Sequence, residues 1–355
     1  MAADSNVDML SAWRPLTFAK KKKVFELPRP LAPIFDTHAH LRSFWGEDKD
    51  AVAVLTRAYA AGVRRVVTLY DPISDASKET PDVQGFSTWL NAVIAEAEAG
   101  RGDVSPREGV LQGEGTARGV FAEQGGTVAQ DARATSIPQV QYLVGVHPYG
   151  APEYSDEHHA QLEAALNDPL CAGIGEIGLD YHFDADDNVE AAPHGLQMEV
   201  MARQLEIAIR HNVPVELHIR NDADDERREA HADALKVLRE VGVPQAGCVL
   251  HCFGEDRVTM EQFLEMGCHI AFGGAATFKR NDAVREAFAA CPLDRLLLET
   301  DCPYMAPEPL RGLECEPAMI AQTVDILIYD RADRTGELPE QIARAIWSTS
   351  TALFA

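Results

Sequence analysis

The stretch Ile34-Phe35-Asp36-Thr37-His38-Ala39-His40-Leu41 decides the fold of this 355-residue chain. Its apolar start is typical of a buried strand, and its polar end carries two histidines separated by one residue. Because side chains alternate between the faces of a strand, His38 and His40 project from one face, with Asp36 behind them. Two such imidazoles can bind a metal such as Zn, Mn or Fe. An HxH triplet also arises by chance, so a metal site needs support from the rest of the chain.

Seven further apolar, β-branched-rich runs follow this first strand, and stretches with helical periodicity lie between them. The helix expected over 197–211, for example, places Met201, Leu205 and Ile209 on one face. Strands that alternate with helices predict parallel βαβ units, and eight strands predict an α/β fold with a single closed (β/α)8 TIM-type barrel rather than an open doubly wound sheet. The expected strands cover 34–38, 64–69, 141–146, 171–177, 213–219, 247–252, 268–272 and 295–300.

Two segments exceed what a minimal barrel needs. Residues 1–31 form a polar N-terminal extension, expected to be a surface arm, and the barrel domain covers 32–355. Residues 71–139 form a long insertion after the second strand. Its first part has the periodicity of a helix, and its second part is glycine-rich, which predicts a mobile loop. The loop would lie at the rim of the barrel, either as a lid or as a passive surface insertion. The apolar face of the expected helix consists of Phe86, Leu90, Val93, Ile94 and Ala97.

The composition is that of a globular protein with a strong acidic excess. Hydrophobic residues make up 46% and charged residues 25%, and the formal net charge is −24. A protein that grips a nucleic-acid duplex along its length needs a broad basic face, which this charge excludes. The one basic run, Lys20 to Lys23, is interpreted as a solvated tail. Any phosphate-bearing substrate must therefore be held locally, where metal ions reverse the sign of the field.

The sequence carries no sign of export or membrane insertion. No stretch is long and apolar enough to span a membrane, and residues 1–6 lack the features of a secretory signal. Seven scattered cysteines, an odd number, argue against a disulfide framework. We therefore expect a cytoplasmic protein with no membrane contact and no obligate protein partner.

Ligand-type side chains stand at the ends of most of the expected strands. Active sites of closed barrels lie at the rim formed by the carboxyl ends of the strands, and each strand contributes one or two residues there. One buried histidine or ion pair needs no functional explanation, but several at the same height of one barrel indicate a common site. The residues are His38, His40, His147, Glu176, His218, His251, Glu299 and Asp301.

This set is too large for one catalytic zinc, which typically takes three protein ligands and keeps one position open. It suits two metal ions roughly 3.5–4 Å apart with a bridging carboxylate, an arrangement used to hydrolyse phosphate esters and amides. Such ions lower the pKa of water, which supplies the nucleophile near neutral pH. The sequence contains neither a Gly-x-Ser-x-Gly elbow nor a Walker A motif that would favour another mechanism.

Six motifs follow one another along the chain: 36–41 (DTHAHL), 145–148 (GVHP), 175–181 (GEIGLDY), 218–220 (HIR), 251–253 (HCF) and 299–304 (ETDCPY), the last followed by Pro307 and Arg311-Gly312. As a set they resemble the TatD family of metal-dependent deoxyribonucleases, which belongs to the amidohydrolase-like barrels. The resemblance runs from about residue 33 to the C-terminus, without the insertion. It implies a divalent-metal hydrolase that acts on DNA ends or nucleotide-like phosphodiesters, often from the 3′ end.

The resemblance also implies roles for individual residues. Two divalent metal ions (Zn, Mn or Mg) would be bound by two sets of side chains with one bridging carboxylate, namely His38, His40 and Asp301; His218 and His251; and Glu176. Asp301 would also act as the general base, so Asp301 and Glu176 are the expected catalytic residues.

Further residues are candidates for substrate binding or support. His147 would contact the substrate phosphate or the leaving oxygen. Arg220 and Lys279 are candidates for phosphate contacts, with a solvated surface role as the alternative for each. Tyr181 either stacks on a base or packs under the rim. Glu299 either orients a metal ligand from behind or forms a buried ion pair below the site.

The chain departs from the family pattern at Tyr149, at 221–223, at Gly254 and at Cys315. None of these positions is an expected metal ligand, but they bear on substrate preference. The prediction is a divalent-metal-dependent hydrolase of phosphodiester bonds, a 3′–5′ exodeoxyribonuclease that uses water activated by two metals. One alternative is a metal-dependent amidohydrolase or esterase acting on a small non-nucleic substrate, since a fold does not fix a substrate. The other is a non-catalytic binding protein on the same scaffold.

Overall fold

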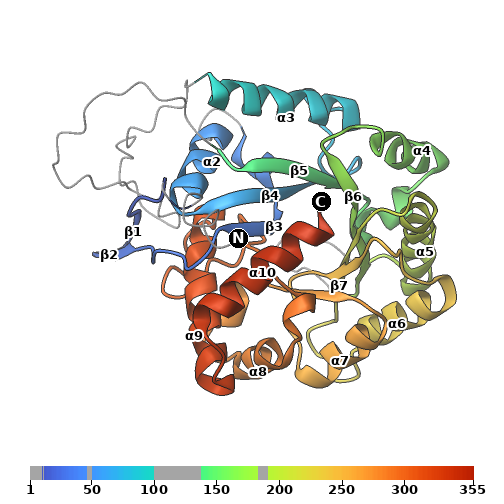
Figure 1. Ribbon diagram of the computed structural model, residues 1–355. Helices are drawn as coiled ribbons and strands as arrows, with labels where there is room; N and C mark the ends of the chain where they lie inside the picture. The colour runs from blue at the N-terminus through green and yellow to red at the C-terminus, as the bar shows by residue number, and fades with distance from the viewer. Residues whose placement is uncertain (1–9, 11, 46–49, 100–136, 183–190) are drawn as a thin grey trace.

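Parallel strands arranged in chain order form the centre of the molecule, and helices surround them (Figure 1). The computed structural model describes residues 10, 12–45, 50–99, 137–182 and 191–355. Within this part, one eight-stranded sheet consists of β3 (Ile34–Ala39), β4 (Val63–Tyr70), β5 (Gln139–Val144), β6 (Cys171–Asp180), β7 (Val215–Arg220), β8 (Cys248–Leu250), β9 (His269–Phe272) and β10 (Leu296–Leu298). The described helices are α2 (Ala51–Ala60), α3 (Val83–Glu98), α4 (Asp156–Ala165), α5 (His194–His211), α6 (Glu229–Val241), α7 (Arg257–Glu265), α8 (Asp282–Ala290), α9 (Ile320–Thr335) and α10 (Pro339–Leu353).

The first and last strands meet and nearly close the sheet into a barrel. The backbone N–H of Asp301, just beyond β10, donates to the carbonyl of His38 in β3 at 3.0 Å. Two residues before His38 in β3, the carboxylate of Asp36 accepts from the backbone N–H and the hydroxyl of Thr300 at 2.8 and 2.7 Å. These bonds satisfy polar groups that are fully buried. The predicted α/β barrel is therefore confirmed, and its closure lies at the strand end that carries the HxH triplet.

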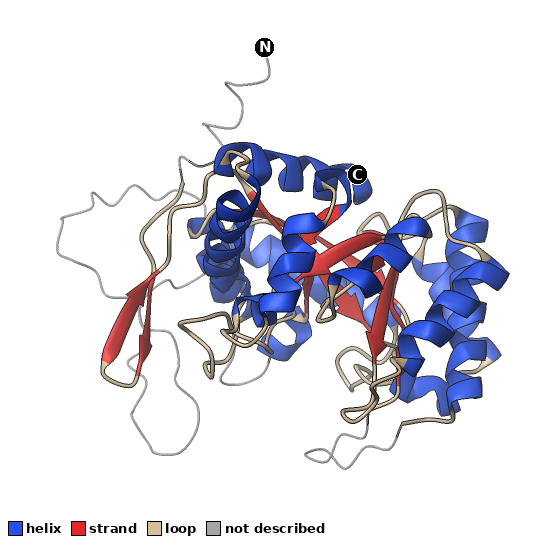
Figure 2. Ribbon diagram, turned by 90° about the horizontal axis from the view of Figure 1, so that it is seen from below, coloured by secondary structure: helices blue, strands red, loops and turns tan. Residues whose placement is uncertain are grey.

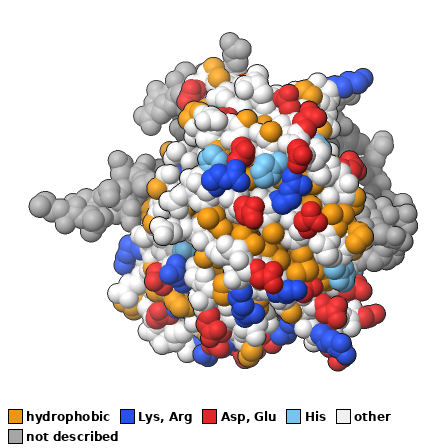
Figure 3. Space-filling view, turned by 90° about the vertical axis from the view of Figure 1, so that its right-hand side faces the viewer, with side chains coloured by type: hydrophobic (Ala, Val, Ile, Leu, Met, Phe, Trp, Pro, Cys, Tyr) orange, Lys and Arg blue, Asp and Glu red, His pale blue; other side chains and the backbone are white. Residues whose placement is uncertain are grey.

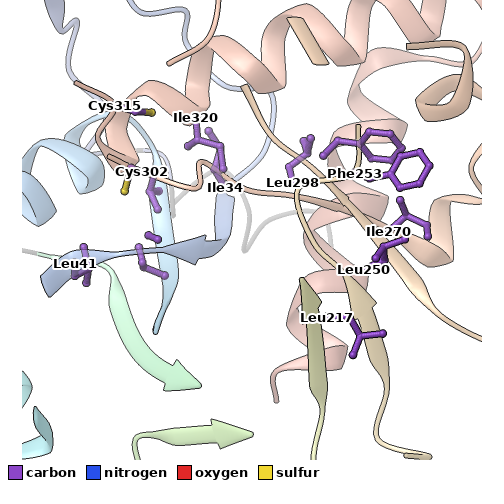
Figure 4. Packing of buried hydrophobic residues seen from close by; sticks show 14 of the residues in the cluster. Ile34, Leu41, Leu217, Leu250, Phe253, Ile270, Leu298, Cys302, Cys315 and Ile320 are labelled. Carbon is purple, nitrogen blue, oxygen red and sulfur yellow. The ribbon is translucent and has the colours of Figure 1, made fainter. Parts of the chain in front are cut away.

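Side chains of each strand alternate between the barrel interior and the helical layer. Leu297 points into the barrel and Leu298 outward, and Val249 and Leu250 divide in the same way between two buried clusters. Figure 4 shows the outward-facing Leu250 and Leu298 in the layer between sheet and helices, together with Ile270. This double burial explains why the strands appear in the sequence as continuous apolar runs.

Helix α10 covers one end of the barrel (Figure 1). The rings of Trp347 and Phe354 lie 6.4 and 5.8 Å from the ring of Phe35, measured between centroids. Phe35 is buried at the start of the barrel interior, so these aromatic contacts fill the amino-terminal end. The opposite end, at the carboxyl ends of the strands, carries His38 and His40.

The N-terminal extension differs from the predicted polar arm. Residues Thr17–Lys20 (β1) and Lys23–Glu26 (β2) form an antiparallel hairpin, which stands beside the barrel in Figure 2. Its inner face is apolar, since Leu16, Phe18 and Leu27 are buried in the main hydrophobic cluster. The alternation of Leu16 and Phe18 anchors the segment, and the lysine run of residues 20–23 is the tip of the hairpin.

The helical part of the insertion is confirmed as α3, with Phe86, Leu90, Val93 and Ala97 buried on one face. The glycine-rich part predicted to be a loop lies outside the described residues. None of the described helices is long and apolar enough to cross a lipid bilayer. All seven cysteines are free thiols, in agreement with the absence of a disulfide framework.

Candidate metal centre

Side chains from five strands converge at the open end of the barrel. They come from β3, from β6, from β7 and from the residues just after β8 and β10, and they are His38 and His40, Glu176, His218, His251 and Asp301. The strands β8 and β10 are shorter than predicted, so His251 and Asp301 stand just beyond them rather than within them. Every one of the six residues expected at the centre is nonetheless brought into it.

One half of the cluster combines His38 in β3 and His40, which directly follows β3, with an aspartate. The Nε2 atoms of His38 and His40 are 3.1 Å apart. The Oδ1 atom of Asp301 lies 3.6 Å from the first and 3.4 Å from the second. Asp301 has a φ of 55°, a conformation uncommon for a non-glycine residue, and its backbone hydrogen bond to β3 fixes it there. These three side chains could hold one cation.

The other half combines two histidines with Glu176. His218 Nδ1 and His251 Nε2 are 3.1 Å apart, and Glu176 Oε1 lies 3.4 and 3.5 Å from them. The second oxygen of this carboxylate faces the first half of the cluster, with Oε2 3.8 Å from His40 Nε2. Glu176 therefore stands between the two groups of nitrogen atoms and presents one oxygen to each.

A glycine places Glu176 at this position. Gly178, two residues later in β6, has a φ of +145°, and a Cβ atom there would lie 2.1 Å from the carbonyl oxygen of His218. Only glycine permits this approach of β6 to β7. The approach sets Glu176 and His218 side by side.

Two carboxylates behind the histidines determine which nitrogen atoms face the centre. His38 Nδ1 lies 2.6 Å from Glu216 Oε1, and both side chains are fully buried. His218 Nε2 lies 3.0 Å from Asp180 Oδ2. Since a carboxylate only accepts, each of these nitrogens carries the proton, and the other nitrogen of each ring directs a lone pair into the cluster.

When the rings are neutral, lone pairs of histidine nitrogens and carboxylate oxygens thus face one another at 3.4–3.9 Å. Such an arrangement of acceptors is stabilised by a bound cation, and a mixed imidazole and carboxylate set suits Zn, Mn or Fe. The residues present therefore fit divalent metal ions. Among the described residues, groups with metal-ligand geometry include His38, His40 and Asp301, and also His38, Glu176 and His251.

The carboxylates and imidazoles of the cluster stabilise each other's charged forms. Burial alone would raise the pKa of Glu176, but the surrounding histidines lower it well below its usual value. Burial likewise opposes the shift of Asp301, whose pKa the neighbouring imidazoles lower. For His218, hydrogen bonds to carboxylates outweigh burial and raise the pKa to about 9. The carboxylates are therefore ionised at neutral pH, and a cation would compete with protons for the histidines.

Glu299 lies behind the second half of the cluster. Its Oε1 atom accepts from the backbone N–H of Cys252 at 2.5 Å and is 3.5 Å from Nδ1 of His251. Complete burial raises the pKa of Glu299 to about 8. Glu299 therefore lies beside His251, behind the second half of the cluster.

His147 lies at the edge of the cluster, with its ring 4.4 Å from that of His218 between centroids. Its Nδ1 atom accepts from the backbone N–H of Tyr149 at 3.2 Å, which leaves the proton on Nε2. Burial lowers the pKa of His147 to about 3, so the ring is neutral. It therefore offers a neutral hydrogen-bond donor beside the centre.

The other residues considered for substrate contact differ in how close they lie to the cluster. Arg220 is 45% exposed and its guanidinium lies 3.9 Å from Asp180, so it stands at the rim of the cluster. Lys279 is exposed after β9, and no contact with the cluster is present among the described residues. Tyr181 is buried, and it donates to Asp233 at 3.0 Å, so it packs under the rim.

Two functional positions were missed by sequence reasoning, Glu216 and Asp180. A signal was present for Glu216, because a glutamate in the otherwise apolar run 213–217 needs a buried partner. Its partner is His38, 178 residues away in the chain, which no sequence spacing could indicate.

A pocket of about 560 Å³ opens beside His251. This volume is within the range of small-molecule sites. Its wall includes two arginines, a buried histidine and an aromatic ring, namely Arg220, Arg228, His231 and Phe253. The pocket lies between the segments that follow β7 and β8, so it borders the second half of the cluster.

With this geometry established, the chain can be compared with known proteins. The profile of the family described as TatD related DNase matches residues 35–355. The chain belongs to this family. It is an enzyme of the TatD hydrolases, and the extension with the hairpin β1–β2 precedes the part that matches the family.

Individual relatives agree with this assignment. An uncharacterized metal-dependent hydrolase, YcfH of Escherichia coli K12, is 36% identical over 201 residues, which cover 57% of this chain and 70% of the relative. A 3′-5′ ssDNA/RNA exonuclease TatD of Pantoea vagans is 34% identical over 215 residues, 59% of this chain and 76% of the relative. The crystal structure of YjjV, a TatD homologue of Escherichia coli K12, superposes with a TM-score of 0.63 at 25% identity and covers 90% of this chain and 97% of that one.

Proposed function

We propose that this TatD-family enzyme is a phosphodiesterase that uses two divalent metal ions to remove nucleotides from the 3′ end of single-stranded DNA. The observation that carries the proposal is the position of Glu176. Its carboxylate faces both halves of the cluster, with Oε1 3.4 Å from His218 and Oε2 3.8 Å from His40. A carboxylate shared in this way is the hallmark of sites that hold two ions.

One ion would be held by His38, His40 and Asp301, and the other by His218 and His251. Bound ions would supply Lewis acidity toward a phosphoryl oxygen and would lower the pKa of water at the site. The behaviour of the protein side chains follows from their positions. Glu216 and Asp180 hold the imidazoles in the tautomers that binding requires.

Asp301 would act as the general base. Its carboxyl is 9% exposed, so it borders the open mouth, and its lowered pKa keeps it ionised at neutral pH. An ionised carboxylate at this position can orient the attacking water and accept its proton. The backbone bond from Asp301 to His38 keeps the carboxylate aligned with the first half of the cluster.

Substrate binding would involve His147, Arg220 and the pocket beside His251. The Nε2–H group of His147 is free to donate to a phosphate or leaving oxygen, and Arg220 offers a charged donor at the rim. The pocket has room for one nucleoside. Lys279 would contact a phosphate further along the strand. The 3′–5′ direction and the single-stranded substrate follow the activity for which the Pantoea vagans relative is named.

The test is cleavage of a 5′-labelled single-stranded oligonucleotide by the purified enzyme with Mn²⁺. We expect a ladder of products shortened from the 3′ end, and no product from Glu176→Ala. Glu206→Ala, which removes an exposed glutamate of α5, is the matched control and should cleave normally. Lack of cleavage of single-stranded DNA, single-stranded RNA and duplex by the parent enzyme would overturn the proposal.

A second comparison separates a nuclease from a hydrolase of small neutral substrates. Arg220→Ala combined with Lys279→Ala removes two charges that a phosphodiester chain needs and a neutral ester does not. We expect DNA cleavage to fall and hydrolysis of a neutral aryl ester to stay absent or unchanged. Efficient hydrolysis of the ester, with DNA left intact, would favour the amidohydrolase or esterase alternative.

A further inference from the structure

The tip of the hairpin β1–β2 carries four consecutive lysines. In the register of the two strands, Lys20 lies opposite Lys23, and Lys21 and Lys22 form the turn. Lys21, Lys22 and Lys23 are exposed. No described acidic side chain forms an ion pair with any of these three. The tip is thus a concentrated positive charge on a chain whose formal net charge is −24.

Two features of this tip are unfavourable for the hairpin itself. Lys21 has a φ of 57°, a left-handed conformation that tight hairpin turns normally assign to glycine or asparagine. Like charges directly opposite each other, as at Lys20 and Lys23, destabilise an antiparallel pair. A turn residue in an unfavourable conformation and a repulsive cross-strand pair at the same place together indicate a functional constraint. A polyanion bound at the tip would remove the charge repulsion.

The tip is attached to the rim of the barrel that carries the metal centre. The Nζ atom of Lys20 donates to the carbonyl of Pro309 at 2.9 Å. Pro309 lies in the segment that runs from Asp301 to the start of α9. The neighbouring Glu308 donates its backbone N–H to Thr277 Oγ1 at 2.9 Å, in the segment that follows β9. The hairpin therefore stands on the β9–β10 side of the mouth.

Other cations lie along the same side. The guanidinium of Arg311 is 4.3 Å from the ring centroid of Phe278, and Phe278 is followed by the exposed Lys279 and Arg280. Within residues 20–23, 278–281 and 308–314, the acidic residues are Glu308 and Glu314. Elsewhere charges are mixed, as on the face over α4, α5 and α6 in Figure 3, where acidic and basic side chains are interspersed.

We infer that the lysine hairpin Lys20–Lys23, continued by Arg311, Lys279 and Arg280, is a binding surface for the backbone of a single-stranded nucleic acid upstream of the cleaved end. The inference rests on the proposed function, because it places a phosphodiester chain in the mouth. Regularly spaced phosphates are the anions that a row of lysines and arginines neutralises. An anionic membrane surface is the other polyanion to test, but a lysine bonded to the rim segment favours a ligand that also enters the mouth.

The test compares the triple variant Lys21→Gln, Lys22→Gln, Lys23→Gln with the parent full-length enzyme. The matched control removes three exposed cations on the outer helices, Lys236→Gln, Arg239→Gln and Arg344→Gln. Lys20 is retained, since its bond to Pro309 anchors the hairpin. Thermal unfolding of all three proteins establishes that the barrel is intact. The substrates are single-stranded oligonucleotides of 3 and 20 nucleotides and bis(p-nitrophenyl) phosphate, with kcat and KM measured from 50 to 200 mM NaCl.

We expect KM for the 20-mer to rise about tenfold at 50 mM NaCl in the hairpin variant, with kcat unchanged. Three lost contacts should reduce the slope of log affinity against log salt by about 2, since each phosphate contact to a single strand contributes roughly 0.7. The 3-mer, bis(p-nitrophenyl) phosphate and the control variant should show no change. An unchanged KM and salt slope in a folded hairpin variant would overturn the inference while the proposed function stands.

Two other outcomes are equally informative. If the parent enzyme cleaves no nucleic acid, the proposed function fails, and the inference fails with it. If the three lysines are needed to bind phosphatidylserine vesicles but not for KM on the 20-mer, the surface is a membrane contact and the inference is wrong.

Discussion

Replacing Glu216 with glutamine should weaken metal binding although Glu216 is not itself expected to touch a metal. Its Oε1 atom is 2.6 Å from His38 Nδ1, and both side chains have 0% exposure. Glutamine keeps the size and can still accept from the ring N–H, but it loses the negative charge that makes the imidazole a stronger ligand. Partners of this kind typically change metal affinity or activity by 10–100-fold.

The structure favours the upper end of that range. Both side chains are fully buried, so bulk solvent does not screen the lost charge. We therefore expect a loss of about 100-fold in affinity for the metal ion held by His38, or about 2.7 kcal/mol. The other oxygen of Glu216 is buried with no hydrogen-bond partner among the described residues, so the new NH₂ group gains none. An added cost to folding of about 1–3 kcal/mol follows.

The assay is competition for Mn²⁺ and Zn²⁺ against a fluorescent chelator, together with kcat on the 20-mer at saturating metal. The matched control is Glu316→Gln, which removes a carboxylate that pairs with Arg57 on the outside of the barrel. It should alter stability and leave metal affinity unchanged. A Glu216→Gln protein that is folded and binds metal as tightly as the parent would refute the reasoning.

Three further outcomes follow from the structure. Gly178→Ala should destabilise the fold by about 1–3 kcal/mol from backbone strain alone, measured by urea unfolding, whereas Gly195→Ala, where a Cβ meets no atom within 4 Å, should not. Burial lowers the pKa of His231 to about 4, so the unfolded chain binds a proton that the folded one does not. Stability should therefore fall as the pH drops from about 6.5 to about 4, by up to about 3 kcal/mol, and His231→Gln should flatten that slope. Removal of metal with a chelator should lower the unfolding midpoint, and Mn²⁺ at 100 times its Kd should restore about 2.7 kcal/mol in the parent but not in Asp301→Ala. A parent protein indifferent to chelator would contradict this last expectation.

The barrel and the six central residues could be predicted from the sequence because both follow a pattern that repeats along the chain. Strands buried on two faces appear as apolar runs, and a ligand at the end of each run falls at the barrel rim whatever the exact strand boundary. Thus His251 and Asp301 were placed correctly although β8 and β10 end before them. The helix α3 was predicted for the same reason, since its buried face repeats with helical spacing.

What could not be predicted depends on contacts between distant segments. The pairing of Glu216 with His38 requires the two side chains to meet across the barrel interior, and no local pattern encodes this. The hairpin β1–β2 was missed because its strands are four residues long and its turn is made of lysines rather than Asn-Gly. The packing of Leu16, Phe18 and Leu27 against the barrel shows that the segment is folded.

The central claim is that Glu176 is shared by two metal ions, and anomalous diffraction from crystals grown with Mn²⁺ tests it most directly. The account predicts two anomalous peaks per chain roughly 3.5–4 Å apart. One peak should lie among His38, His40 and Asp301, and the other beside His218 and His251, with the Glu176 carboxylate between them. A single peak, or peaks that leave Glu176 without a metal on either side, would contradict the account.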